Sequence, residues 1–234
     1  MSIKEGSFIE IDYEARIASN NRMFDTTKER IAKQNGLEGS PKPQRIIIGA
    51  QHVIKGLDAE LKKHTVGDSF SVIIPAQDAF GSRNQKLVRL IPLKEFREKN
   101  MRPLPGMVLD FQGVQGTIMS ASGGRVRVDF NHPLAGRTVV YDVTINREIT
   151  DKKEQIGVIL DVRLNEQNPD ITIADKKATI TLAQKLPEHY TKHICEEIEK
   201  YTGLKAEFVK KEEKKEDTTE KKPAKTPAKK ADNE

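Results

Sequence analysis

The sequence predicts an α+β fold: an antiparallel β-sheet wrapped on a short helix, with an inserted mainly-β domain and a C-terminal α/β domain. Three observations predict this organisation. Apolar and polar residues alternate along several short segments, one segment between them has helical spacing, and the chain of 234 residues is longer than a single domain usually is. A few antiparallel strands with one helix over their apolar face form an α+β architecture.

The first predicted strand is Phe8–Ile17, where isoleucine, tyrosine and alanine alternate with charged residues. This period of two is typical of a strand with one buried face, and it puts Tyr13 on that face. Three more segments have the short apolar runs or the alternation of strands in the same sheet: Arg45–Ile48, Ser69–Ile74 and Val139–Ile145.

One helix is predicted between these strands, at Val53–Lys63. Ile54, Leu57 and Leu61 share one face there, and Val66–Asp68 reads as the turn into the next strand. We therefore expect a short helix lying on one face of the sheet.

Residues 84–130 interrupt the predicted sheet. A structureless loop of that length is improbable inside a compact fold, so we interpret the segment as an inserted domain. Ser122–Gly124 predicts a hairpin turn within it. Its strand-like pieces are Met107–Phe111, Val114–Met119 and Arg125–Phe130.

After residue 151 the pattern changes again. Val158–Leu164 and Ala178–Leu182 are predicted as strands, and a helix is predicted to open at Pro187 and to end at Gly203. Leu204–Val209 is compatible with a further strand. These elements predict a C-terminal α/β domain.

Four parts of the chain follow from these patterns. Residues 1–83 plus 131–151 form a discontinuous first domain, 84–130 the inserted domain, 152–209 the C-terminal domain and 210–234 a charged tail. The tail has no large apolar side chain that could anchor it, so we expect it to be disordered.

Charge and cysteine content exclude several classes of protein. The net charge is +5, but the tail carries nine lysines against seven acidic residues, which weakens the hypothesis that it binds ribosomal RNA or another polyanion. The single cysteine, Cys195, cannot form an intrachain disulfide, and no segment is typical of an export signal or a membrane span. We therefore expect a cytoplasmic protein with no membrane partner.

The informative feature is a set of separated motifs whose aromatic and aliphatic members could line one pocket. In chain order they are Tyr13, Phe24–Asp25, Val53–Leu57, Asp78–Gly81, His132–Gly136 and Tyr141. Each motif is weak by itself, because such residues usually just fill an interior. Their joint occurrence in this order is a strong signal.

The order of these motifs and the residues within them resemble those of FKBP-type prolyl isomerases. Ile48–Gly49, the Val66–Asp68 turn and the Asn131–Gly136 flap also look like signatures of that family, and the resemblance covers roughly the first three-fifths of the chain. An insertion between Gly81 and Asn131 resembles the SlyD-like branch, whose inserted domain binds unfolded chains. With the additional C-terminal domain, the whole chain looks like an archaeal long-type FKBP.

The resemblance implies a catalytic pocket with Asp25 at its polar edge. Two of its positions depart from the commonest family pattern: Leu57 stands where many members have Trp, and Phe80 stands where many have Tyr. The second change removes a hydroxyl, which puts tight binding of macrolide drugs in doubt. The implied floor and walls are Tyr13, Phe24, Val53, Ile54, Leu57, Phe80, Leu134 and Tyr141.

Prolyl isomerisation needs no nucleophile, because rotation about the X-Pro bond breaks no covalent bond. We accordingly predict no cofactor and no metal. His189 and His193 are spaced i, i+4 near Cys195, but no third or fourth ligand is evident nearby in the sequence.

The predicted function is a peptidyl-prolyl cis/trans isomerase that accelerates folding and also holds unfolded chains through its inserted domain. The alternative is mainly a chaperone or client-binding protein with weak isomerase activity. The expected partners are unfolded or nascent polypeptides that contain X-Pro bonds. Four residues are candidates for client binding, or alternatively for the insertion's own core: Met101, Met107, Phe111 and Met119.

The predicted C-terminal helix carries one apolar stripe. This stripe either packs on the domain's own strands or pairs with a second copy to make a homodimer, and the sequence leaves both readings open. Its members are Tyr190, Ile194, Ile198 and Tyr201.

Overall fold

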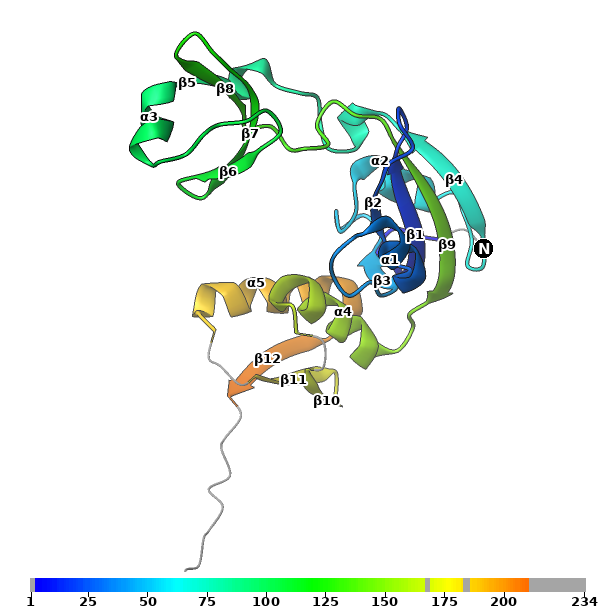
Figure 1. The fold of residues 1–234 in the computed structure, drawn as a ribbon. Helices are drawn as coiled ribbons and strands as arrows, with labels where there is room; N and C mark the ends of the chain where they lie inside the picture. The colour runs from blue at the N-terminus through cyan, green and yellow to red at the C-terminus, as the bar shows by residue number, and fades with distance from the viewer. Residues whose placement is uncertain (1–2, 167–168, 183–185, 211–234) are drawn as a thin grey trace, which may run out of the picture.

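The computed structural model describes residues 3–166, 169–182 and 186–210, which form three β-sheets with helices (Figure 1). We call them the main sheet, the inserted sheet and the C-terminal sheet. The predicted disordered tail, residues 210–234, lies outside the described residues except for Lys210. The combination of mostly antiparallel sheets with few helices confirms the α+β class.

The main sheet is antiparallel, with the strand order β2-β1-β9-β4 and with β3 also paired to β1. Strand β1 is therefore central, and it has hydrogen bonds to three other strands. The strands are β1 (Phe8–Ile17), β2 (Met23–Thr26), β3 (Gln44–Ile47), β4 (Ser69–Ile74) and β9 (Val139–Glu148).

The buried face of the main sheet is covered by helix α2 (Lys55–Leu61), whose Leu57 and Leu61 are buried. Gly56 brings the helix close to β4, because a Cβ atom at this position would collide with the side chain of Ile74. The alternation in β1 puts Ile9, Ile11 and Ala15 into the same core, as the sequence predicts. The shorter helices near this sheet are α1 (Glu29–Asn35) and the 3-10 turn Ala76–Asp78.

The inserted sheet has the order β5-β8-β7-β6, and every neighbouring pair is antiparallel. Gly123 and Gly124 have φ of 58° and 74°, the left-handed values that a two-residue hairpin turn requires. The elements are the 3-10 turn Gln85–Leu87, β5 (Val88–Pro92), α3 (Leu93–Glu98), β6 (Val108–Phe111), β7 (Val114–Ser122) and β8 (Arg125–Asp129).

The chain leaves the main sheet for the insertion and returns to it at one place. The Asn131 side chain accepts from the backbone N–H of Asn84 at 2.8 Å and donates to its carbonyl at 2.9 Å. A backbone bond from Gly136 to the carbonyl of Gly81, also 2.8 Å, joins the same two segments. Two linkers tied in this way restrict how the insertion can move.

The C-terminal sheet pairs β10 with β11 antiparallel and β11 with β12 parallel. Helix α5 starts after Pro187 and ends at Gly203, which has φ of 73°, as the sequence predicts. The elements of this part are α4 (Lys152–Leu164), β10 (Asp170–Ala174), β11 (Lys177–Leu182), α5 (Glu188–Thr202) and β12 (Lys205–Lys210).

The strand predicted at Val158–Leu164 is wrong, because these residues form the second half of helix α4. The Asp151 carboxylate accepts from the backbone N–H of Glu154 at 2.8 Å and caps the helix. Ile156 and Ile159 are then buried in the C-terminal core. Burial and the cap outweigh the weak preference of β-branched residues for strands.

A second core joins the C-terminal part to the main sheet. Phe8 and Ile47, from β1 and β3, are buried together with Ile159, Ile194 and Ile198 of helices α4 and α5. The two isoleucines of the α5 stripe are thus covered by the chain's own residues and are not available for a dimer contact.

His52 follows β3 and is largely removed from water. Its Nδ1 accepts from the backbone N–H of Ile47 at 3.2 Å, and its Nε2 is buried without a partner among the described residues. Burial lowers the pKa of His52, which the nearby carboxylate of Glu197 opposes only in part. Folding therefore favours the neutral form of this ring.

We predict that Phe8→Ala lowers the free energy of unfolding by about 3–5 kcal/mol, since Phe8 is 2% exposed and its removal leaves a cavity in the second core. Denaturant titration measures the change. Ile73→Ala is the control: Ile73 is 69% exposed on β4, and we expect a loss below about 1 kcal/mol. Equal losses in the two variants would contradict the assignment of Phe8 to a packed core.

We also predict a pH-dependent stability that depends on His52. Because the folded pKa lies below the ordinary value of 6.5, the unfolded chain takes up the proton first as the pH falls, and stability is lost below about pH 6.5. Denaturation between pH 7 and pH 5 measures the loss. His52→Asn keeps an acceptor for the Ile47 N–H and should flatten this slope; an unchanged slope would refute the role of His52.

Candidate active site

The predicted pocket residues meet in one cavity on the buried face of the main sheet. The cavity has a volume of about 390 Å³. Seven of the nine predicted site residues line it, from β1, β2, β9 and the segment around α2: Tyr13, Asp25, Val53, Ile54, Leu57, Phe80 and Tyr141. Residues far apart in sequence therefore form one site, here called the catalytic pocket.

Aromatic rings form its frame. The ring centroids of Tyr13 and Tyr141 lie 5.5 Å apart, and Phe24 meets Phe80 and Tyr141 edge-on at 5.8 and 6.1 Å. Such edge contacts add stability beyond area burial and hold the rings in defined positions.

The one carboxylate of the pocket is held by a tyrosine. The Tyr13 hydroxyl donates to the Asp25 carboxylate at 2.7 Å. Burial, and then this hydrogen bond, raise the pKa of Tyr13, while burial and the charge of Asp25 raise the pKa of Tyr141. Both phenols therefore stay protonated at physiological pH and remain hydrogen-bond donors.

Phe24 and Leu134 line the neighbouring cavity instead. That cavity has a volume of about 540 Å³ and includes Leu37 and Pro133. Because the Phe24 ring touches Phe80 and Tyr141, it forms the wall between the two cavities.

The flap residue His132 packs directly on the pocket. Its ring stacks on Phe80 with centroids 4.8 Å apart, and its Nδ1 accepts from the backbone N–H of Leu134 at 3.1 Å. These contacts give His132 a structural role beside the pocket.

Three polar residues of the catalytic pocket were not predicted: Gln44, Gln51 and His52. Gln44 opens β3, and Gln51 has the left-handed φ of 59°. Gln51 and His52 directly precede Val53, and this proximity is the one sequence feature that could have predicted them as pocket residues. No sequence feature could have predicted Gln44, because its place depends on how β3 pairs with β1.

The predicted client-binding residues fall into two groups. Met101, Met107 and Phe111 pack against the core of the inserted sheet, which supports their reading as core residues. Met119 is 37% exposed on the opposite face.

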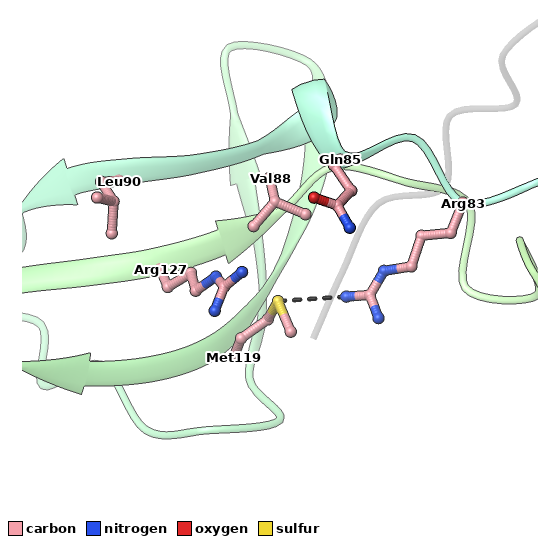
Figure 2. A pocket seen from close by; sticks show the side chains of 6 residues that line it. All are labelled: Arg83, Gln85, Val88, Leu90, Met119 and Arg127. Atoms are coloured by element: carbon pink, nitrogen blue, oxygen red, sulfur yellow. Dashed lines mark hydrogen bonds between the residues drawn. The ribbon is translucent and has the colours of Figure 1, made fainter.

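Met119 lies in a groove of about 430 Å³, here called the insert groove (Figure 2). The side chains in Figure 2 come from three neighbouring strands and the preceding linker, and Arg83 donates to the Met119 sulfur at 3.2 Å. The lining residues are Arg83, Gln85, Val88, Leu90, Met119 and Arg127.

No group of three or more His, Cys, Asp or Glu side chains is placed to hold a metal within the part of the chain that the structure describes. Among those same residues, no helix is long and apolar enough to cross a membrane.

Two family models match the sequence. One, described as FKBP-type peptidyl-prolyl cis-trans isomerase, matches residues 1–98, and one described as FKBP26, IF domain, matches residues 89–134. The second match falls on the inserted sheet.

Curated relatives agree with these matches. A short-type peptidyl-prolyl cis-trans isomerase of Methanocaldococcus jannaschii is 28% identical over 146 residues, 61% of this chain and 92% of the relative. SlyD of Helicobacter pylori, an FKBP-type isomerase, is 30% identical over 158 residues, 65% of this chain and 78% of the relative. A probable FKBP-type 16 kDa isomerase of Pseudomonas fluorescens is 32% identical over 108 residues, 44% and 71% of the two chains. The chain therefore belongs to the FKBP-type peptidyl-prolyl cis-trans isomerases and is an enzyme of that class.

Proposed function

We propose that this isomerase rotates X-Pro bonds in the catalytic pocket and holds unfolded segments of its polypeptide substrates in the insert groove. The proposal that X-Pro bonds rotate in the catalytic pocket is supported by the pocket itself, a cavity framed by aromatic and aliphatic side chains with one carboxylate at its edge. The exposed apolar side chains of the insert groove support the second half.

The chemistry of the reaction suits such a pocket. Rotation about a peptide bond meets a barrier of roughly 18–20 kcal/mol because the twisted amide loses its resonance. The planar amide has more charge separation between oxygen and nitrogen than the twisted one. An apolar, water-poor site therefore disfavours the planar form relative to the transition state.

The polar groups of the pocket then orient the substrate. The protonated Tyr141 hydroxyl is a donor that suits a substrate carbonyl group, while the Tyr13 hydroxyl donates its hydrogen bond to Asp25 and so holds the carboxylate in place at the edge. Orientation of this kind contributes to catalysis by reducing the entropy lost on reaching the transition state. The apolar walls thus lower the barrier to rotation of the amide, and the polar groups at the edge determine the orientation of the substrate.

The insert groove has the chemistry of a surface for unfolded chains. Leu90 is 61% exposed, and Val88 and Met119 lie beside it on the same face. Exposed apolar side chains grouped in a hollow usually mark a binding site, and methionine adapts to varied partners. Strand β5 is also an edge strand, so an extended segment could pair with its free backbone groups.

For the pocket we predict that Phe80→Ala lowers kcat/KM for an X-Pro tetrapeptide by about 10- to 100-fold, since it removes one apolar wall. Phe70→Ala is a matched control. Phe70 is also a partly buried phenylalanine that packs on the same core and stacks on a histidine, His64, but it does not line the pocket. A similar loss in both variants would mean that general destabilisation, and not the wall, sets the rate.

For the insert groove we predict that Leu90→Ser weakens the binding of a permanently unfolded, carboxymethylated protein by about 5-fold, while the tetrapeptide rate is unchanged. Leu104→Ser is the control, because Leu104 is 51% exposed in the same insertion but lies outside the groove. Fluorescence anisotropy measures the affinity. Unaltered affinity in Leu90→Ser, or an equal loss in Leu104→Ser, would exclude the groove as the client surface.

A further inference from the structure

A second cavity continues the catalytic pocket towards the C-terminal part. It has a volume of about 310 Å³ and shares Tyr13, Asp25 and Gln44 with the catalytic pocket. Its other walls come from residues 40–45 and from helix α4. The two cavities are therefore parts of one cleft, and we call the outer part the α4 cleft.

Helix α4 contributes Asp161 and Val162 to this cleft, and Asn165, the residue that follows the helix, also lines it. Asp161 pairs with Arg45 at 3.1 Å and with Lys42 at 3.3 Å, which fixes α4 against β3 and the segment before it. The opposite side of the helix is anchored in the second core. The wall that α4 forms is therefore held in place beside the active site.

Val162 is the apolar member of this wall. It is 45% exposed, whereas Ile159 and Leu160, three and two positions before it, are almost completely buried. Its side chain thus lies in a cleft that leads from the catalytic pocket and is not covered by the chain's own described residues.

The opposite wall contains Pro41 and Pro43. Proline has no backbone N–H, so Pro41 and Pro43 present apolar rings and no backbone donor to the cleft, while Ser40, Thr26 and Thr27 add hydroxyl groups to its lining. The carboxylates of the cleft are already engaged, Asp161 by two cations and Asp25 by the Tyr13 hydroxyl. With these charges paired, an uncharged segment suits the cleft, and an apolar side chain of that segment suits Val162 and the two prolines.

We propose that the α4 cleft binds the stretch of substrate polypeptide next to the X-Pro bond, with Val162 in contact with an apolar substrate side chain a few residues from the proline. The proposal rests on the proposed function of the catalytic pocket, from which the cleft continues. It makes the C-terminal part a contributor to substrate specificity: a short peptide fills the pocket alone, and a longer one also reaches Val162.

The test compares two substrates on the full-length protein. One is an X-Pro tetrapeptide, and the other is the same core extended at both ends by apolar residues, with a serine-extended peptide as reference. For Val162→Ser we expect an unchanged kcat/KM on the tetrapeptide. On the apolar extended peptide we expect a loss of about 3- to 10-fold, carried by KM and not by kcat. Val162→Leu should keep the wild-type value.

Val209→Ser is the matched control. Val209 is the same residue type in the same C-terminal part, with 46% exposure on β12, but it is outside the cleft. The quantity compared is the kcat/KM on the apolar extended peptide relative to that on the serine-extended peptide. The proposal is overturned if this ratio in Val162→Ser equals that of the wild type, or if Val209→Ser lowers it as much as Val162→Ser does. A wild-type protein that fails on the tetrapeptide would instead overturn the proposed function of the pocket, so the two failures are distinguishable.

Discussion

The burial of strand β1, along one face and through Phe8 at the start of the other, is the interaction on which the rest of the structure depends. Its odd-numbered residues Ile9, Ile11 and Ala15 enter the core beneath helix α2, and Phe8 points the other way into the core shared with α4 and α5. One strand thus joins the main sheet to the C-terminal part. Because Tyr13 belongs to the odd-numbered set, the same alternation brings it to the catalytic pocket.

Two residues of the catalytic pocket differ from those most common in the family, yet the pocket remains apolar. Leu57 is buried at the floor where a larger ring is common in the family, and Phe80 lacks a hydroxyl but gains a stacked partner in His132. The apolar character that favours a twisted amide is retained. The polar groups of the pocket are the two tyrosines, Asp25, Gln44, Gln51 and His52, and among them the Tyr13 hydroxyl holds the Asp25 carboxylate.

In our proposals, three surfaces of the protein bind the same kind of ligand, an unfolded polypeptide. The catalytic pocket takes the X-Pro bond, the α4 cleft takes the adjoining residues, and the insert groove takes unfolded segments. The wall of the α4 cleft is fixed by a shared core and two ion pairs, and the two linkers of the insertion are tied together at Asn84 and Asn131.

Local patterns by themselves determined much of the fold, while the composition of the pocket was predicted from the resemblance of the ordered motifs to FKBP-type isomerases. Alternation predicted β1, helical spacing predicted α2, and Gly203 and the Gly123–Gly124 pair predicted a helix end and a hairpin, because each depends on a few adjacent residues. The α4 segment was predicted as a strand, since its β-branched residues favour strands unless a cap and a core hold the helix. Strands β2, β5 and β10 and the short helices α1 and α3 were not predicted from the sequence.

Among the site residues, seven of nine predicted ones share the pocket, while Phe24 and Leu134 line its neighbour. Only the tertiary structure decided that Gln44 lies at the pocket and that Val162 faces the cleft that continues from it. Both depend on the pairing of β3 with β1 and the docking of α4. Such contacts join residues distant along the chain, and no local pattern encodes them.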